Sequence, residues 1–138
     1  MDVRPFSATM HCLSGCLVGE VMGLTIGVFL QWPAWQTICL ATALAYVSGY
    51  ALALYPIVSK KIGLLGAIKT IWLAETISIG IMELAMNSVD YLIGGVDAGS
   101  VFEPIFWIGL AFAVLAGFLI GYPANFFLIK HGLKRACR

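Results

Sequence analysis

Four side chains that can bind a metal ion or a proton stand close together near the start of the chain. They lie within one apolar segment and are His11, Cys12, Cys16 and Glu20. In a helix, the four-residue spacing of the last three places them on one face. Imidazole, thiolate and carboxylate groups are ligands of transition metals. Because ionisable groups at membrane depth are costly and are seldom kept without a function, the spacing predicts a metal-binding face.

A second polar face is predicted on the segment around residues 75–90, where polar and sulfur-bearing residues recur at three- and four-residue intervals. Counting about 1.5 Å per residue along both helices places Cys16 near the depth of Glu75, and Glu20 nearer the midplane with Ser78 to Glu83. We therefore expect one polar column through the helices. Its expected metal ligands are His11, Cys12, Cys16, Glu20, Glu75 and Glu83, and its other lining residues are Ser78, Met82, Met86, Asn87 and Asp90.

The composition shows which environment these helices need. The chain has 138 residues, of which 61% are hydrophobic and 11% charged, and its mean hydropathy is +0.96. Soluble domains carry about 25% charged residues, so the sequence predicts an all-α membrane protein with the lipid bilayer as its partner. A spanning helix needs about 20 apolar residues, and the stretches 9–30, 34–58, 64–89 and 104–129 supply four of them in one domain. No basic run alternates with aromatic residues, which argues against a nucleic-acid partner.

All eight Lys and Arg residues fall on one side of this four-span arrangement. They precede the first span, join the second to the third, or follow the fourth: Arg4, Lys60, Lys61, Lys69, Lys130, Lys134, Arg135 and Arg138. The opposite side carries Asp97 and Glu103. Because cytoplasmic loops hold the excess of basic residues, we expect both termini to face the cytoplasm.

Small residues form stripes on three of the predicted helices. The first helix has Gly15, Gly19, Gly23 and Gly27; the second has Ala45, Gly49 and Ala53; the fourth has Ala113, Gly117, Gly121 and Asn125. Such stripes let helix backbones approach closely. They predict either a tightly packed bundle or close packing between protomers of a homo-oligomer.

Three motifs extend over nearly the whole chain. They are His11-Cys12 with Cys16 and Gly19-Glu20, Glu75 with Met82-Glu83, and Tyr122-Pro123-Ala124-Asn125. In these motifs the chain resembles a family of small four-helix bacterial membrane proteins of unknown function. The resemblance implies a four-span bacterial membrane protein and brings no established activity with it.

The function expected from these residues is transport and not catalysis. Cysteine and methionine favour Cu or Zn, whereas added carboxylates favour Zn or Fe, so we expect a transition-metal transporter or channel of the bacterial cytoplasmic membrane. One alternative is a proton or alkali-cation pathway lined by the glutamates, in which the cysteines only pack. A third interpretation is a membrane redox protein, with either reactive thiols or a haem bound by His11 and His131.

Overall fold

Four helices make up the part of the chain that this computed structural model describes, residues 3–58 and 63–131. They are α1 (Val3–Phe29), α2 (Ala34–Val58), α3 (Leu64–Ile93) and α4 (Pro104–Lys130). No strand occurs in those two ranges, so the predicted all-α class is confirmed for them. The helix α1 begins well before residue 9, and α3 continues past residue 89. Lys60, Lys61 and the basic residues after position 131 lie outside the described residues.

Three of these helices are long and apolar enough to cross a membrane. The spans are Thr9–Phe29, Ala34–Tyr55 and Pro104–Lys130, with mean hydropathies of 1.8, 1.7 and 2.2. The helix α3 is of similar length, but Lys69 and three acidic residues interrupt its apolar sequence. The fold is therefore that of a multi-pass membrane protein in which the helix with the most acidic residues, α3, carries most of the buried carboxyl groups.

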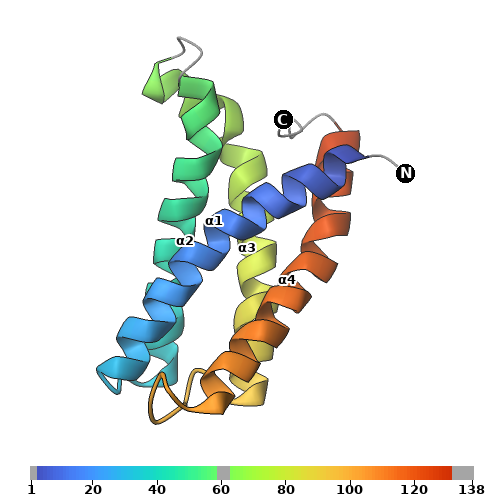
Figure 1. Ribbon diagram of the computed structural model, residues 1–138. Coiled ribbons are helices and arrows are strands. Elements are labelled where there is room, and N and C mark those ends of the chain that lie inside the picture. The colour runs from blue at the N-terminus through green and yellow to red at the C-terminus, as the bar shows by residue number, and fades with distance from the viewer. Residues whose placement is uncertain (1–2, 59–62, 132–138) are drawn as a thin grey trace.

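The helices run alternately up and down, and α1 crosses the others obliquely (Figure 1). The C-terminal half of α1 lies along α2, whereas its N-terminal half passes in front of α3 and ends beside the C-terminal end of α4 (Figure 1). A ring contact supports this approach, since the centroids of Phe6 and Phe118 are 5.8 Å apart. As a result, α1 contacts all three other helices and can bring its polar residues to α3.

The glycine stripe of α1 packs directly on α2 of the same chain. A Cβ atom added at Gly19 would lie 2.2 Å from the Ala45 nitrogen, and one added at Gly23 would lie 2.3 Å from the Ala41 Cα. At these distances only glycine fits, because real Cβ atoms never come so close to a neighbouring backbone. This contact fixes the rotation of α1 and leaves its Cys12 and Glu20 side directed at α3.

The small-residue stripe of α4 receives two methionines from α3. A Cβ atom at Gly117 would lie 2.8 Å from the Met86 side chain, and one at Gly121 would lie 2.8 Å from that of Met82. Both methionines are completely buried. Long thioether side chains adapt to irregular spaces, so these contacts join α3 to α4 closely along the polar face.

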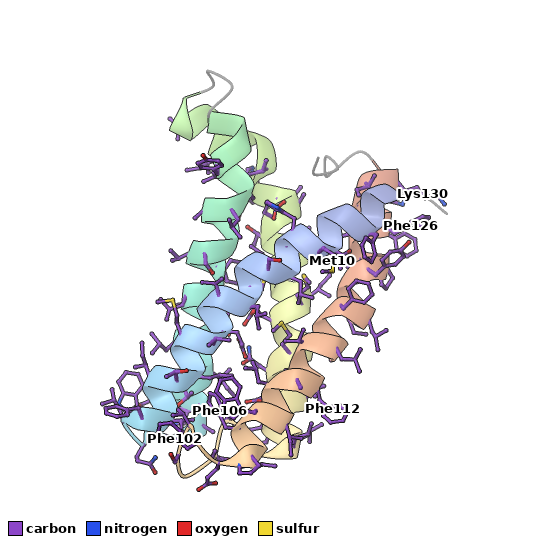
Figure 2. The ribbon with its side chains drawn as sticks, in the orientation of Figure 1. Met10, Phe102, Phe106, Phe112, Phe126 and Lys130 are labelled. Carbon is purple, nitrogen blue, oxygen red and sulfur yellow. The ribbon has the colours of Figure 1, made fainter. Side chains whose placement is uncertain are left out.

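Bulky side chains divide between the interior and the outer surface. Phe106 is buried with Leu24 and Val28 and points in between α1 and α4 (Figure 2). Phe112 and Phe126 instead project outward from α4 (Figure 2), where both are exposed. A helix that is apolar on its outer side as well as its inner side is typical of a membrane span.

Candidate cation-binding site

A chain of hydrogen bonds joins α1, α3 and α4 at one end of the polar face. The Ser78 hydroxyl donates to Asn125 Oδ1 over 2.9 Å, and the Asn125 amide donates to Thr9 Oγ1 over 3.1 Å. The sulfur of Cys12 lies 3.4 Å from Ser78 Oγ. Because a hydroxyl has a single proton to donate, the Cys12 thiol is the donor in this last contact. The Cys16 thiol lies against that of Cys12, one helical turn further along.

Glu20 and Glu83 bring two carboxyl groups together where α1 passes α3. Their exposed fractions are 0% and 2%, and the two side chains lie within hydrogen-bonding reach of each other. Ionised carboxylates can only accept, so a hydrogen bond between them requires a proton on one. Within the described residues, neither oxygen of Glu20 receives a donor, nor does Oε1 of Glu83. Because buried charge is costly unless it is compensated, this pair needs either a proton or a cation.

Asn87 stands one turn after Glu83 on α3 and is held by its amide nitrogen. This nitrogen donates to Glu83 Oε2 over 3.1 Å, to the Glu83 carbonyl oxygen over 3.0 Å and to Thr42 Oγ1 on α2 over 3.1 Å. The amide oxygen Oδ1 is buried and has no hydrogen-bond donor in the described part of the chain. Asn87 therefore links α2 to the carboxyl pair and presents an oxygen that only accepts.

Asp90 occupies the last turn of α3 in a space left by two glycines. A Cβ atom added at either Gly95 or Gly109 would lie 2.5 Å from Asp90 Oδ1. The helix ends just after it, since Gly94 adopts a left-handed conformation with φ 101° and donates to the Asp90 carbonyl oxygen. The carboxyl group is 1% exposed, and neither of its oxygens has a donor among residues 3–58 and 63–131.

The register between α1 and α3 differs from the one expected by counting residues. Cys12 contacts Ser78, and Glu20 lies against Glu83. The depth of Cys16 is therefore closer to that of Glu83 than to that of Glu75. The expectation that Cys16 and Glu75 lie at similar depth was wrong for two reasons. The helix α1 begins earlier than predicted, and it crosses α3 obliquely instead of running parallel to it (Figure 1).

The other predicted site residues take different positions. His11 turns toward α2, where its Nε2 atom lies 3.0 Å from the Leu52 carbonyl oxygen. Glu75 is buried nearer the N-terminal end of α3, and the sulfurs of Met82 and Met86 lie against the α4 glycines. Within the described ranges, no three His, Cys, Asp or Glu side chains converge closely enough to hold a metal ion.

Two buried residues of the network were not predicted as site residues. Asn125 was noted as a member of a small-residue stripe and of the Tyr122-Pro123-Ala124-Asn125 motif, although an amide among alanines and glycines at that spacing is itself a signal of a buried polar contact. Thr9 gave no signal, because threonine occurs in helices without any partner on another helix. Both are completely buried and hydrogen-bonded to each other.

A groove between α2 and α3 leads from the outer surface to this face. Its walls include Thr42 and Tyr46 of α2, and Glu83, Asn87 and Ser88 of α3. The groove is therefore bordered by one residue of the buried pair, Glu83, and by Asn87, which bonds to it. It offers a route to these groups that does not pass between α1 and α3.

These features define a class: a multi-pass helical membrane protein with a buried carboxyl-rich face between α1 and α3. A family model for a domain of unknown function, DUF4396, matches residues 3–134. The chain thus belongs to the DUF4396 family, in agreement with the resemblance to a family of unknown function. No curated protein and no solved structure matches it.

Proposed function

We propose that this protein conducts cations across a membrane along the buried carboxyl groups of Glu20, Glu83 and Asp90. The observation that carries the proposal is that all three are buried while five of their six oxygens have no hydrogen-bond donor in the described part of the chain. Carboxyl groups in that state bind cations or protons readily. Residues of this kind inside membrane helices mark ion and proton pathways.

The nearest described lysines support a pathway more than a static ion pair. Lys69 and Lys130 are both exposed, and Lys69 precedes Glu83 by fourteen residues on α3, which corresponds to about 21 Å along the helix. The buried carboxyl groups are thus far from these positive charges. A mobile cation or proton is the natural partner for them.

In this proposal α3 is the fourth membrane span, and its polar face is shielded from lipid by α1 and α4. The N-terminal end of α1 and the C-terminal end of α4 lie at the same end of the bundle (Figure 1). Among the described residues, Arg4, Lys69 and Lys130 belong to the helix ends on that side, so we assign it to the cytoplasm by the excess of positive charge in cytoplasmic loops. The membrane proposed is the bacterial cytoplasmic membrane.

Transition-metal transport is a second candidate, and one observation favours it. The Cys16 thiol lies against the Cys12 thiol, on the face of α1 that also carries Glu20 one turn further along. Thiolates select Cu(I) or Zn(II) over harder ions. In this version Cu, Zn or Fe is the transported substrate, and copies of the chain associate as a homo-oligomer around the pathway.

Flux through purified protein in liposomes tests the proposal. We expect Glu20→Gln and Glu83→Gln each to reduce the flux of protons or metal cations strongly, because each replaces a carboxylate by a neutral amide. Glu103→Gln is the matched control, since Glu103 is exposed in the α3–α4 connection. Parent-like flux of every cation in both buried variants would refute the pathway.

A further inference from the structure

The polar atoms left without a partner on the buried face are all of one chemical kind. They are Glu20 Oε1 and Oε2, Glu83 Oε1, Asn87 Oδ1, and Asp90 Oδ1 and Oδ2. All six are oxygen acceptors, and no nitrogen or hydroxyl donor in the described residues shares that state. Buried polar atoms in proteins are nearly always hydrogen-bonded. A group of acceptors without donors is therefore a place for a positive charge.

Asn87 favours a metal cation over a proton as the positive species bound by these acceptors. Its nitrogen is committed to Glu83 Oε2, the Glu83 carbonyl oxygen and Thr42 Oγ1. With the nitrogen in these contacts, the amide oxygen Oδ1 is left without a donor in the described part of the chain. The carbonyl oxygen of an amide does not bind a proton near neutral pH, whereas it is a common ligand of Na⁺ and Ca²⁺. A proton pathway needs only the carboxyl groups and has no use for it.

The groove supplies the remaining requirement, which is access. Glu83 and Asn87 both line it, and so do the Thr42 and Ser88 hydroxyls. A cation in the groove would lie beside two of the residues that carry the buried acceptors. Water in the groove can complete a coordination shell for which the protein provides only part of the ligands.

We infer that Glu20, Glu83 and Asn87 form a binding site for a hard, oxygen-preferring metal cation of the alkali or alkaline-earth class, reached through the groove between α2 and α3. This inference rests on the proposed function and names its ion. Oxygen ligands suit Na⁺, Mg²⁺ and Ca²⁺, whereas Cu(I) and Zn(II) prefer the thiols and imidazoles. The Cys12 and Cys16 thiols serve packing and hydrogen bonding in this arrangement.

Equilibrium binding in detergent tests the site without any transport. Thermal unfolding of the purified protein is measured in metal-free buffer and after addition of NaCl, MgCl₂, CaCl₂ or ZnCl₂, since a ligand that binds only the folded state raises the midpoint. We expect Na⁺, Mg²⁺ or Ca²⁺ to raise the midpoint in a saturable manner. Zn²⁺ is expected to raise it less, and to act equally on a Cys12→Ser, Cys16→Ser variant.

Two substitutions of Asn87 identify the amide oxygen as a ligand. Asn87→Leu keeps the size of the side chain but removes the oxygen, and we expect it to weaken binding of the stabilising cation by about tenfold or more. Asn87→Asp keeps an oxygen and is expected to retain binding. Ser14→Ala is the control, because Ser14 is exposed on α1, bonds to a carbonyl oxygen of its own helix and does not line the groove.

Each outcome decides between the site and the pathway. Stabilisation by Zn²⁺ alone, or equal binding by Asn87→Leu and the parent, overturns the hard-cation site. Carboxyl-dependent flux without any stabilisation by Na⁺, Mg²⁺ or Ca²⁺ overturns the site and leaves the pathway standing. Binding of such a cation without flux across liposomes supports the site and refutes the pathway.

Discussion

Glu20 on α1 lies against Glu83 on α3, and neither oxygen of Glu20 receives a hydrogen-bond donor within the described residues. Such a contact costs stability unless a proton or a cation compensates it. It is maintained by the close packing of α1 on α2, because the glycines there fix the rotation of α1. The carboxyl pair is thus a property of the whole arrangement and not of either helix alone.

Replacing Glu20 should stabilise the protein when cations are scarce. In Glu20→Gln the new amide nitrogen can donate to Glu83 Oε1, which has no donor in the described structure. Satisfying a buried polar group is worth about 1–3 kcal/mol, so we expect a higher unfolding midpoint in metal-free buffer. The same variant should lose the stabilisation by added cations. A lower midpoint in metal-free buffer would show that the contact between Glu20 and Glu83 does not destabilise the protein.

The cysteines should be dispensable for conduction of hard cations. The Cys12 thiol hydrogen-bonds to Ser78, and the Cys12 and Cys16 thiols lie against each other. Cys12→Ser with Cys16→Ser therefore keeps groups that can hydrogen-bond in both positions. We expect liposome flux within about twofold of the parent, since a change of that size is under 1 kcal/mol. The exposed Cys39 gives a control in Cys39→Ser. Complete loss of flux in the double variant alone would favour the transition-metal alternative.

The contact between α1 and α2 should not tolerate a methyl group. Gly19→Ala would place its Cβ 2.2 Å from the Ala45 nitrogen, which belongs to a backbone that cannot move aside cheaply. Overpacking of this kind costs about 1–3 kcal/mol, and the unfolding midpoint should fall accordingly. Gly63→Ala is the matched control, because nothing lies within 4 Å of a Cβ there. Equal midpoints for the two variants would contradict the close contact.

The hydrogen-bonded chain through Asn125 should contribute to stability and not to ion selectivity. Asn125→Leu removes the acceptor of the Ser78 proton and the donor to Thr9. Losing a buried partner costs about 1–3 kcal/mol, so we expect a lower unfolding midpoint with an unchanged order of preference among cations. Ser14→Ala is the control, since Ser14 is exposed and bonds to a carbonyl oxygen of its own helix. A changed order of cations would place Asn125 in the pathway.

The fold was predictable because each helix is marked by composition. The apolar stretches gave the helices to within a few residues, except where α1 begins. The polar rows on α1 and α3 followed from their spacing. Whether α3 spans the membrane was not decided by hydropathy, because its acidic residues lower that value.

The details of the site depend on geometry that spacing does not contain. The pairing of Glu20 with Glu83 required the crossing angle of α1, and the orientation of Asn87 required Thr42 on a third helix. Periodicity indicates which residues share a face, but it does not fix the height of one helix against another. For that reason Cys16 was expected near the depth of Glu75 and lies closer to that of Glu83.

The oblique course of α1 has a mechanical consequence. The chain consists of two helical hairpins, since α1 packs most extensively on α2, and α3 on α4. Glu20 belongs to the first hairpin and Glu83 to the second, so a cation bound by both carboxylates would link the two hairpins. Its binding and the separation of the hairpins are then thermodynamically linked. When the cation leaves, the carboxylates of Glu20 and Glu83 repel each other. The force between the two hairpins therefore depends on whether a cation is bound.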